Sequence, residues 1–198
     1  GVVEADGTRF MLIDGMVHTE VDAGTVEPTF SDVDVLDLAA GFYESPGRML
    51  LVGLGGGSVA KRYAAAGWQV EAVEIDPAVT RLARSHFGLE PSQVRVYEMD
   101  GREFLMERGD VYDLIILDAF GSSSIPFHLI TREAFARCKA RLAPDGVLAL
   151  NVIGVGWRDK LVRSVAATLS EEFLRVFVLP MAEPPDQLGN LILFASNG

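Results

Sequence analysis

The sequence predicts an α/β protein in which helices cover both faces of a mostly parallel sheet. From about residue 48 onward, short runs rich in Val, Ile and Leu alternate with helix-like segments. That alternation is typical of parallel strands buried on both faces. Only MAEPPDQLG separates the last two strand-like runs. This connection is too short for a crossover helix, so the last strand is expected to be antiparallel. Together the runs predict a doubly wound sheet of seven strands.

Composition and charge limit the classes of function that are possible for the chain. Its 198 residues are 49% apolar, enough for one domain with its own core. The net charge of −11 argues against nucleic-acid binding, which depends on Lys and Arg contacts to phosphate. The longest apolar runs are too short to span a bilayer, and no secretory signal pattern is seen. The single cysteine, Cys138, excludes an internal disulfide and is expected to be a buried thiol, so the cytoplasm is the expected compartment.

Residues 1–30 are expected to form a β-hairpin extension, and residues 31–198 the main domain. Two apolar runs joined at Asp14-Gly15 predict the hairpin, because that dipeptide favours tight turns. Ser31 is expected to cap a helix that follows. The later strands are expected at 48–54, 68–75, 93–99, 112–117, 146–153, 173–180 and 190–196. The later helices are expected at 58–66, 101–108, 131–142 and 157–172, with one more opened by Asp76 and Pro77.

A glycine-rich turn follows the first strand of the main domain, in LLVGLGGGSVAKRY. Its glycines, Gly53, Gly55, Gly56 and Gly57, permit positive φ and a close approach of a ligand to the backbone. The helix after them presents free N–H groups. Ligands of open α/β sheets bind at this end of the strands. The turn alone does not identify the ligand, because GGGSVA also fits the G-x-G-x-x-A pattern of NAD-binding proteins.

Acidic residues end the next three strands in succession. Glu74 and Asp76 end the second strand, where a carboxylate can accept hydrogen bonds from ribose hydroxyls. Asp100, followed by Gly101, ends the third, where it could accept from an adenine amino group, and Asp118 ends the fourth. A row of acceptors suits a ligand with hydroxyls, an amino group and a positive charge, and repels a pyrophosphate. A sulfonium nucleoside is therefore favoured over NAD. Capping of helices by Asp76 and Asp100, and of a loop by Asp118, is the structural alternative.

The main-domain motifs are LLVGLGGGSVAKR, VEAVEIDPAV, MDGREFL and YDLIILDAF with LITREAF, and the hairpin contains LIDGMVH. Together they resemble the spermidine synthase (polyamine aminopropyltransferase) family, from about Arg9 to Ala195. The resemblance implies a class I AdoMet-dependent methyltransferase fold, Rossmann-like, with AdoMet or decarboxylated AdoMet as co-substrate. It implies Glu74 at the ribose, Asp100 and Gly101 at the adenine, and Gly53 to Gly57 beside the amino-acid-derived tail. Asp118 falls on the family's catalytic aspartate.

The chain departs from that family where the substrate is expected. Family members usually carry an Asp inside the glycine turn that holds the aminopropyl amine, and this position is Gly56 here. The Gln after the hairpin turn is His18, and the Tyr-His pair before the first long helix is Phe30-Ser31. A second Asp after the catalytic one is absent from DAFGSSSIP. The nucleoside half therefore resembles the family more closely than the substrate half does.

Three functions stay open at this point. The resemblance favours a transferase that moves an aminopropyl or other alkyl group from a sulfonium nucleoside to a small-molecule amine. Asp118 would orient the amine and accept its proton. Methyl transfer from AdoMet to an unknown small acceptor is the alternative, and a non-catalytic nucleoside-binding domain, or a domain of a larger chain, is the second. His128 either contacts substrate or packs. No metal is expected, because the histidines lack ligand spacing beside an acid. The oligomeric state stays open: a homodimer is one candidate, because the N-terminal hairpin of such folds often packs against a second copy. A membrane partner is not expected.

Overall fold

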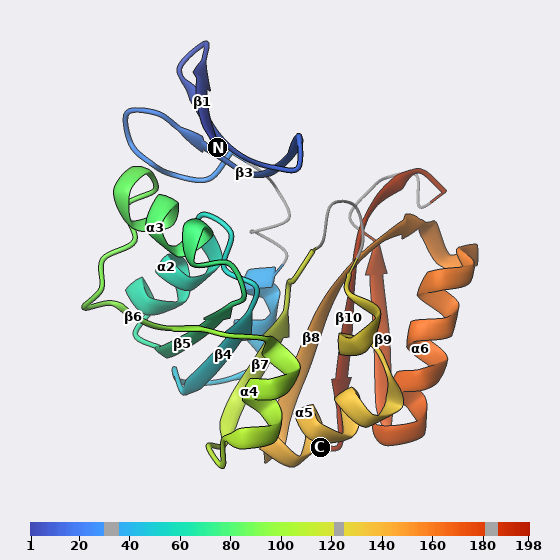
Figure 1. Cartoon of the computed structure of the whole chain (residues 1–198). Coiled ribbons are helices and arrows are strands. Elements are labelled where there is room, and N and C mark those ends of the chain that lie inside the picture. The colour runs from blue at the N-terminus through green and yellow to red at the C-terminus, as the bar shows by residue number, and fades with distance from the viewer. Residues whose placement is uncertain (30–35, 121–124, 181–185) are drawn as a thin grey trace.

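The computed structural model describes residues 1–29, 36–120, 125–180 and 186–198. Its main sheet has the strand order β6-β5-β4-β7-β8-β10-β9 (Figure 1). The parallel strands are β4 (Arg48–Val52), β5 (Gln69–Glu74), β6 (Val94–Glu98), β7 (Tyr112–Leu117) and β8 (Leu142–Val155). β10 (Leu188–Ser196) runs antiparallel between β8 and β9 (Arg175–Pro180). The predicted fold class, with its antiparallel last strand, is confirmed.

Helices cover both faces of this sheet. The elements η1 (Asp37–Phe42), α2 (Ser58–Ala65) and α3 (Pro77–His86) pack on one face. The other face carries α4 (Gly101–Glu107), α5 (Arg132–Arg141) and α6 (Lys160–Glu172), and the short helices η2 (Phe127–Leu129) and η3 (Gly156–Arg158) lie in connections. Along β4, Met49 and Leu51 pack in the core under η1 and α2, whereas Leu50 and Val52 pack in the core under α4, α5 and α6. Alternate residues thus fill opposite cores, as a strand buried on both faces requires.

The N-terminal residues form a three-stranded antiparallel sheet, one strand more than the predicted hairpin. Its strands are β1 (Val2–Ala5), β2 (Thr8–Ile13) and β3 (Met16–Asp22). The predicted turn at Asp14-Gly15 joins β2 and β3, with φ of 50° and 79°. Asp6-Gly7 makes a second such turn, with φ of 49° and 77°, which the sequence interpretation missed. The expected boundary at residue 30 and the cap at Ser31 lie outside the described residues, and the chain resumes as η1.

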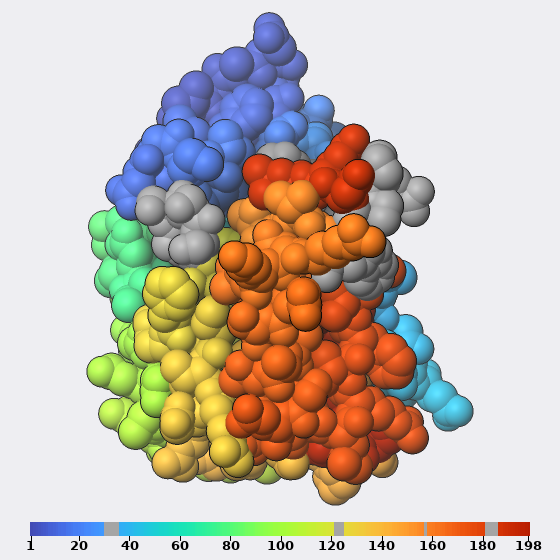
Figure 2. Space-filling model, turned by 90° about the vertical axis from the view of Figure 1, so that its right-hand side faces the viewer, coloured from blue at the N-terminus to red at the C-terminus, as the bar shows by residue number. Residues whose placement is uncertain are grey.

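The N-terminal sheet is docked onto the main domain beside α3, and Figure 2 shows it as a blue lobe standing on the body. Met11 and Val21 are fully buried and pack in one cluster with Phe87. The Lys61 ammonium, on α2, donates to the carbonyl oxygens of Phe87 at 2.6 Å and Val26 at 3.3 Å. Burial lowers the pKa of Lys61 below its ordinary value. The N-terminal segment is therefore held on the main domain by apolar contact and by the hydrogen bond from Lys61 to Val26.

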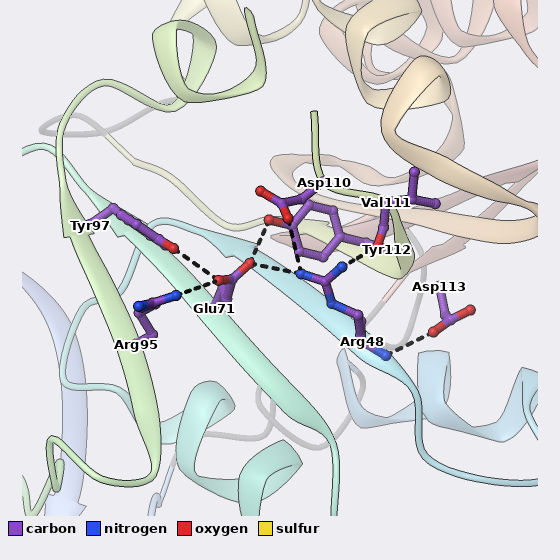
Figure 3. A network of polar contacts seen from close by, with 8 residues as sticks. All are labelled: Arg48, Glu71, Arg95, Tyr97, Asp110, Val111, Tyr112 and Asp113. Carbon is purple, nitrogen blue, oxygen red and sulfur yellow. Dashed lines mark hydrogen bonds and ion pairs between the residues drawn. The ribbon is translucent and has the colours of Figure 1, made fainter. Parts of the chain in front are cut away.

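A polar network joins the four neighbouring strands β4, β5, β6 and β7 (Figure 3). Its centre is the Glu71 carboxylate, which accepts from the Tyr97 hydroxyl at 2.9 Å and the Tyr112 hydroxyl at 2.7 Å. Arg48 and Arg95 also pair with it, at 3.5 and 3.9 Å. Burial, followed by the Glu71 carboxylate, raises the pKa of Tyr112 well above its usual value, so this hydroxyl stays a donor. The network links these four strands to one another, and its residues lie outside the lining of the pocket described below.

The structure bears on the cysteine and on membrane-spanning segments. Cys138 is fully buried on α5, and burial raises the pKa of its thiol to about 12, as expected of a structural thiol. Within the described ranges, no helix has both the length and the apolar character needed to cross a membrane.

Candidate active site

A pocket of about 850 Å³ lies at the carboxyl ends of the parallel strands. The wall is formed by residues within 13–20 of the N-terminal sheet, by Leu36, and by the strand ends and turns within 52–59, 73–75, 99–101 and 118–120. Residues within 126–129 around η2, and within 151–153 and 188–190 of β8 and β10, complete it. Ligands of open α/β sheets bind at this edge, and the volume suits a nucleoside-sized molecule.

The glycine turn brings the ends of β4 and β7 into contact. Gly53 has φ +94°, and a β-carbon there would lie 2.4 Å from the carbonyl oxygen of Asp118. Only glycine can occupy that position. Gly53, Gly55 and Gly56 line the pocket. Gly57 does not belong to the lining: it begins α2 with φ +81° and faces Leu89.

Glu74 lies in the pocket wall and is 9% exposed. Its Oε2 accepts from the Leu54 N–H and its Oε1 from the Asp76 N–H, each at 3.0 Å. The carboxylate thus links the turn after β4 to the end of β5. The Asp76 side chain is outside the lining and caps α3, where its Oδ1 accepts from the Ala78 N–H at 2.8 Å. Of the two acids at this strand end, the structure brings only Glu74 to the pocket.

Asp100 lines the pocket and also caps α4. Its Oδ1 accepts from the N–H groups of Arg102 at 2.8 Å and Glu103 at 3.1 Å. Its Oδ2 lies 2.9 Å from Nε2 of His128, a pocket residue from η2. Gly101 lines the pocket too, and a β-carbon there would lie 2.4 Å from Val52. The sequence interpretation left the role of His128 open, and the structure pairs it with Asp100.

Asp118 follows the last residue of β7 and lines the pocket. Its Oδ1 accepts from Nδ2 of Asn151 at 2.9 Å. The register explains the pair: Leu117 on β7 lies opposite Leu150 on β8, so the next residues along these parallel strands are neighbours. The sequence interpretation missed Asn151, although a single Asn inside the apolar run GVLALNVI was a usable signal.

Thr19, on β3, packs against the glycine turn at Gly56. It is 7% exposed, and its Oγ1 accepts from the Gly56 N–H at 2.7 Å. A β-carbon at residue 56 would lie 2.5 Å from Cγ2 of Thr19. An acid at position 56 therefore cannot be accommodated while Thr19 stays in place. The glycine that replaces the family's Asp at position 56 is matched by Thr19 of the N-terminal sheet, which fills the space beside it.

His18, next to Thr19, faces the same pocket. Burial lowers the pKa of its imidazole, and the carboxylates of Asp14 and Glu74 offset this in part. Within the described part of the chain, no group of three or more His, Cys, Asp or Glu side chains is placed to hold a metal ion.

Comparison with known proteins identifies the class of this fold. The model of a methyltransferase domain matches residues 49–146. The polyamine aminopropyltransferase of Vibrio vulnificus is 35% identical over 162 residues, covering 78% of this chain and 52% of that protein. The structure of a probable spermidine synthase from Corynebacterium glutamicum superposes with a TM-score of 0.87 at 23% identity, over 100% of this chain and 76% of that one. Human methyltransferase-like protein 13, solved in complex with SAH, gives 0.70 at 25% identity, over 85% and 83%.

The chain is thus an α/β protein with the methyltransferase fold. Its sequence is similar to those of polyamine aminopropyltransferases, as its motifs predicted. It spans about half the length of the curated polyamine aminopropyltransferases it matches.

Proposed function

We propose that the chain is a transferase that binds a sulfonium nucleoside in this pocket and passes an alkyl group from it to a small-molecule amine. The observation that carries the proposal is the convergence of Glu74, Asp100 and Asp118, from three strand ends, on one pocket beside the glycine turn. The similarity to polyamine aminopropyltransferases supports aminopropyl transfer as the first candidate reaction.

The described residues fit such a nucleoside. A carboxylate has about four acceptor positions, so Glu74 can still accept from ribose hydroxyls after binding two backbone N–H groups. Asp100 would accept from the adenine amino group, sharing or exchanging its contact with His128. Ser58, at the start of α2, is 6% exposed, and its Oγ lacks a hydrogen-bond partner among the described residues. A polar group of the ligand's tail would supply that partner.

The proposed roles of this chain's residues follow from the chemistry of the transfer. A bound co-substrate of the AdoMet type supplies an alkyl carbon activated by a sulfonium. The leaving thioether is neutral, so no oxyanion needs stabilising. The protein contributes alignment of the amine with that carbon and a base for its proton. Asp118, next to the glycine turn, is the group proposed for both tasks.

Methyl transfer from AdoMet is the second candidate, and the Thr19–Gly56 contact favours it. An acid at position 56 would pair with the free amine of a decarboxylated tail, but Thr19 fills that space. Residues 53–58 of the turn are all neutral, so the turn itself offers this amine no counter-charge. AdoMet is therefore expected to bind at least as tightly as its decarboxylated form.

One assay separates the two reactions even while the natural acceptor is unidentified. The protein is incubated with a panel of amines and either AdoMet or decarboxylated AdoMet, and the released nucleoside is identified by mass spectrometry. Methylthioadenosine reports aminopropyl transfer from the decarboxylated form, and S-adenosylhomocysteine reports methyl transfer. A binder that does not catalyse releases neither.

Thermal melts test the ligand class independently. A ligand at 100 times its Kd adds about 2.7 kcal/mol to the unfolding free energy. Methylthioadenosine or AdoMet should therefore raise Tm measurably, whereas NAD should not. Stabilisation by NAD alone would contradict the proposal.

We also propose the cytoplasm as the compartment, a small molecule rather than nucleic acid as the partner, and a homodimer as the assembly. The first rests on the single cysteine and the second on the net charge of −11. The third rests on the family resemblance of the N-terminal strands.

A further inference from the structure

Three buried side-chain atoms lack a hydrogen-bond partner among the described residues: Ser58 Oγ, Thr80 Oγ1 and Asn151 Oδ1. Leaving such a group unpaired destabilises the fold, so each instance calls for a physical reason. Thr80 lies on α3, outside the pocket lining. Asn151 is 2% exposed, forms part of the pocket wall and touches Asp118, the proposed base.

The orientation of the Asn151 amide follows from its neighbour. An ionised carboxylate only accepts hydrogen bonds, so the NH₂ group must face Asp118 and the carbonyl oxygen must point elsewhere. Ile192, the residue opposite Asn151 on β10, is apolar, and Oδ1 has no hydrogen-bond partner among the described residues. The fold thus sets one carboxylate and one unpaired amide oxygen side by side in the pocket wall.

We propose that Asp118 and Asn151 together hold the nucleophilic nitrogen of a primary amine, an inference that rests on the proposed function. A neutral primary amine has two N–H groups and one lone pair. One N–H donates to Asp118 and the other to Asn151 Oδ1, which leaves the lone pair free to point at the alkyl carbon. Asn151 lines the pocket and its Oδ1 is buried, so holding the amine requires the side chain to turn and present Oδ1 to the nitrogen. A hydroxyl has one hydrogen and would leave Asn151 unpaired, so the pair selects a primary amine.

The transfer balances with these groups alone. The amine nitrogen forms a bond to the alkyl carbon while the carbon–sulfur bond breaks, and the electron pair of that bond leaves on sulfur as a neutral thioether. The extra proton on nitrogen passes to the Asp118 carboxylate. Asn151 exchanges no proton and acts by holding the nitrogen.

The test compares a primary amine with its N-methylated form, which has one N–H fewer in the neutral state. The probes are diaminobutane and N,N′-dimethyldiaminobutane, used with AdoMet and with decarboxylated AdoMet. Wild type should favour the primary amine in kcat/KM by about tenfold or more, the scale of one hydrogen bond. Asn151→Leu keeps the side-chain volume and should reduce this preference to roughly threefold or less. Thr80→Val removes a comparable unpaired atom outside the pocket and should keep the wild-type preference.

Calorimetry of both amines in the presence of methylthioadenosine makes the test independent of turnover. Binding with a preference for the primary amine that depends on Asn151, but without release of a thioether, supports the inference and overturns the proposed function. Transfer that treats the two amines alike in wild type overturns the inference and leaves the proposed function standing. A preference retained in Asn151→Leu, or no binding of either amine, also overturns it. The wild-type comparison needs no variant and is unaffected by any folding defect.

Discussion

Replacing Glu74 by Gln is expected to lower stability and nucleoside affinity by amounts that can be measured separately. The two carboxylate oxygens accept from the N–H groups of Leu54 and Asp76, each at 3.0 Å. Gln keeps one carbonyl oxygen, and its NH₂ group faces the other N–H. One backbone donor thus loses its acceptor at a site that is 9% exposed. The unfolding free energy should fall by about 1–3 kcal/mol. Loss of the charged acceptor for the ribose should weaken binding of methylthioadenosine by roughly 1.5–3 kcal/mol, which is about 10- to 150-fold in Kd.

Glu71 supplies a matched control on the same strand. Its carboxylate accepts hydrogen bonds from Tyr97, Tyr112 and Arg48, and it lies outside the pocket lining. Glu71→Gln should lower the unfolding free energy by about 1–2 kcal/mol and leave nucleoside affinity unchanged. Urea unfolding gives the first quantity, and calorimetry well below both transitions gives the second. Equal affinity of the Glu74→Gln and Glu71→Gln proteins for methylthioadenosine would refute the placement of the ribose at Glu74.

Three further predictions concern the acceptor side and the tail. Asp118→Asn should lower kcat about 10²- to 10⁴-fold with little change in co-substrate Kd, the lost rate returning as pH rises and more amine is neutral; a wild-type rate would remove Asp118 from the mechanism. Gly56→Asp combined with Thr19→Ala should shift the preference in calorimetry toward decarboxylated AdoMet by roughly tenfold, and no shift would show that residue 56 does not face the tail. Because the pKa of His18 is lowered on folding, the unfolded chain binds more protons than the folded one. Stability should therefore fall as pH drops below 6.5, the ordinary histidine value, and His18→Gln should flatten that part of the unfolding profile relative to wild type.

Local sequence signals were sufficient for the fold of the main domain. The helix opened by Asp76 and Pro77 begins where the cap and the proline predict, and the short connection before the last strand produces the antiparallel β9–β10 pair. The pocket edge was predictable for the same reason, since acids that follow parallel strands gather at one end of a sheet. The extra strand β1 was missed for a local reason as well: Asp6-Gly7 carries the same turn signature as Asp14-Gly15.

Contacts between distant residues were not predictable from one sequence. Thr19 and Gly56 are 37 positions apart, Asp100 and His128 are 28 apart, and Asp118 and Asn151 are 33 apart. Each pair depends on how separate elements pack: β3 on the glycine turn, η2 on α4, and β8 beside β7. The spacing of residues along the chain does not predict how separate elements pack. The sequence therefore indicated which acids could form a site, and the structure determines which neighbours each acid acquires.

The two halves of the pocket differ in how their polar groups are satisfied before any ligand binds. On the proposed nucleoside side, Glu74 and Asp100 each accept two backbone N–H bonds, so the fold itself fixes their orientation. Acceptors held in this way bind hydroxyl and amino groups with little rearrangement. On the proposed amine side, Asn151 carries an acceptor that has no partner among the described residues, and the proposed amine would supply one. A hydrogen bond to this oxygen would therefore contribute additional binding free energy at the place where the nucleophile must be held. Amine binding should then stabilise the folded chain by more than its few contacts alone would give.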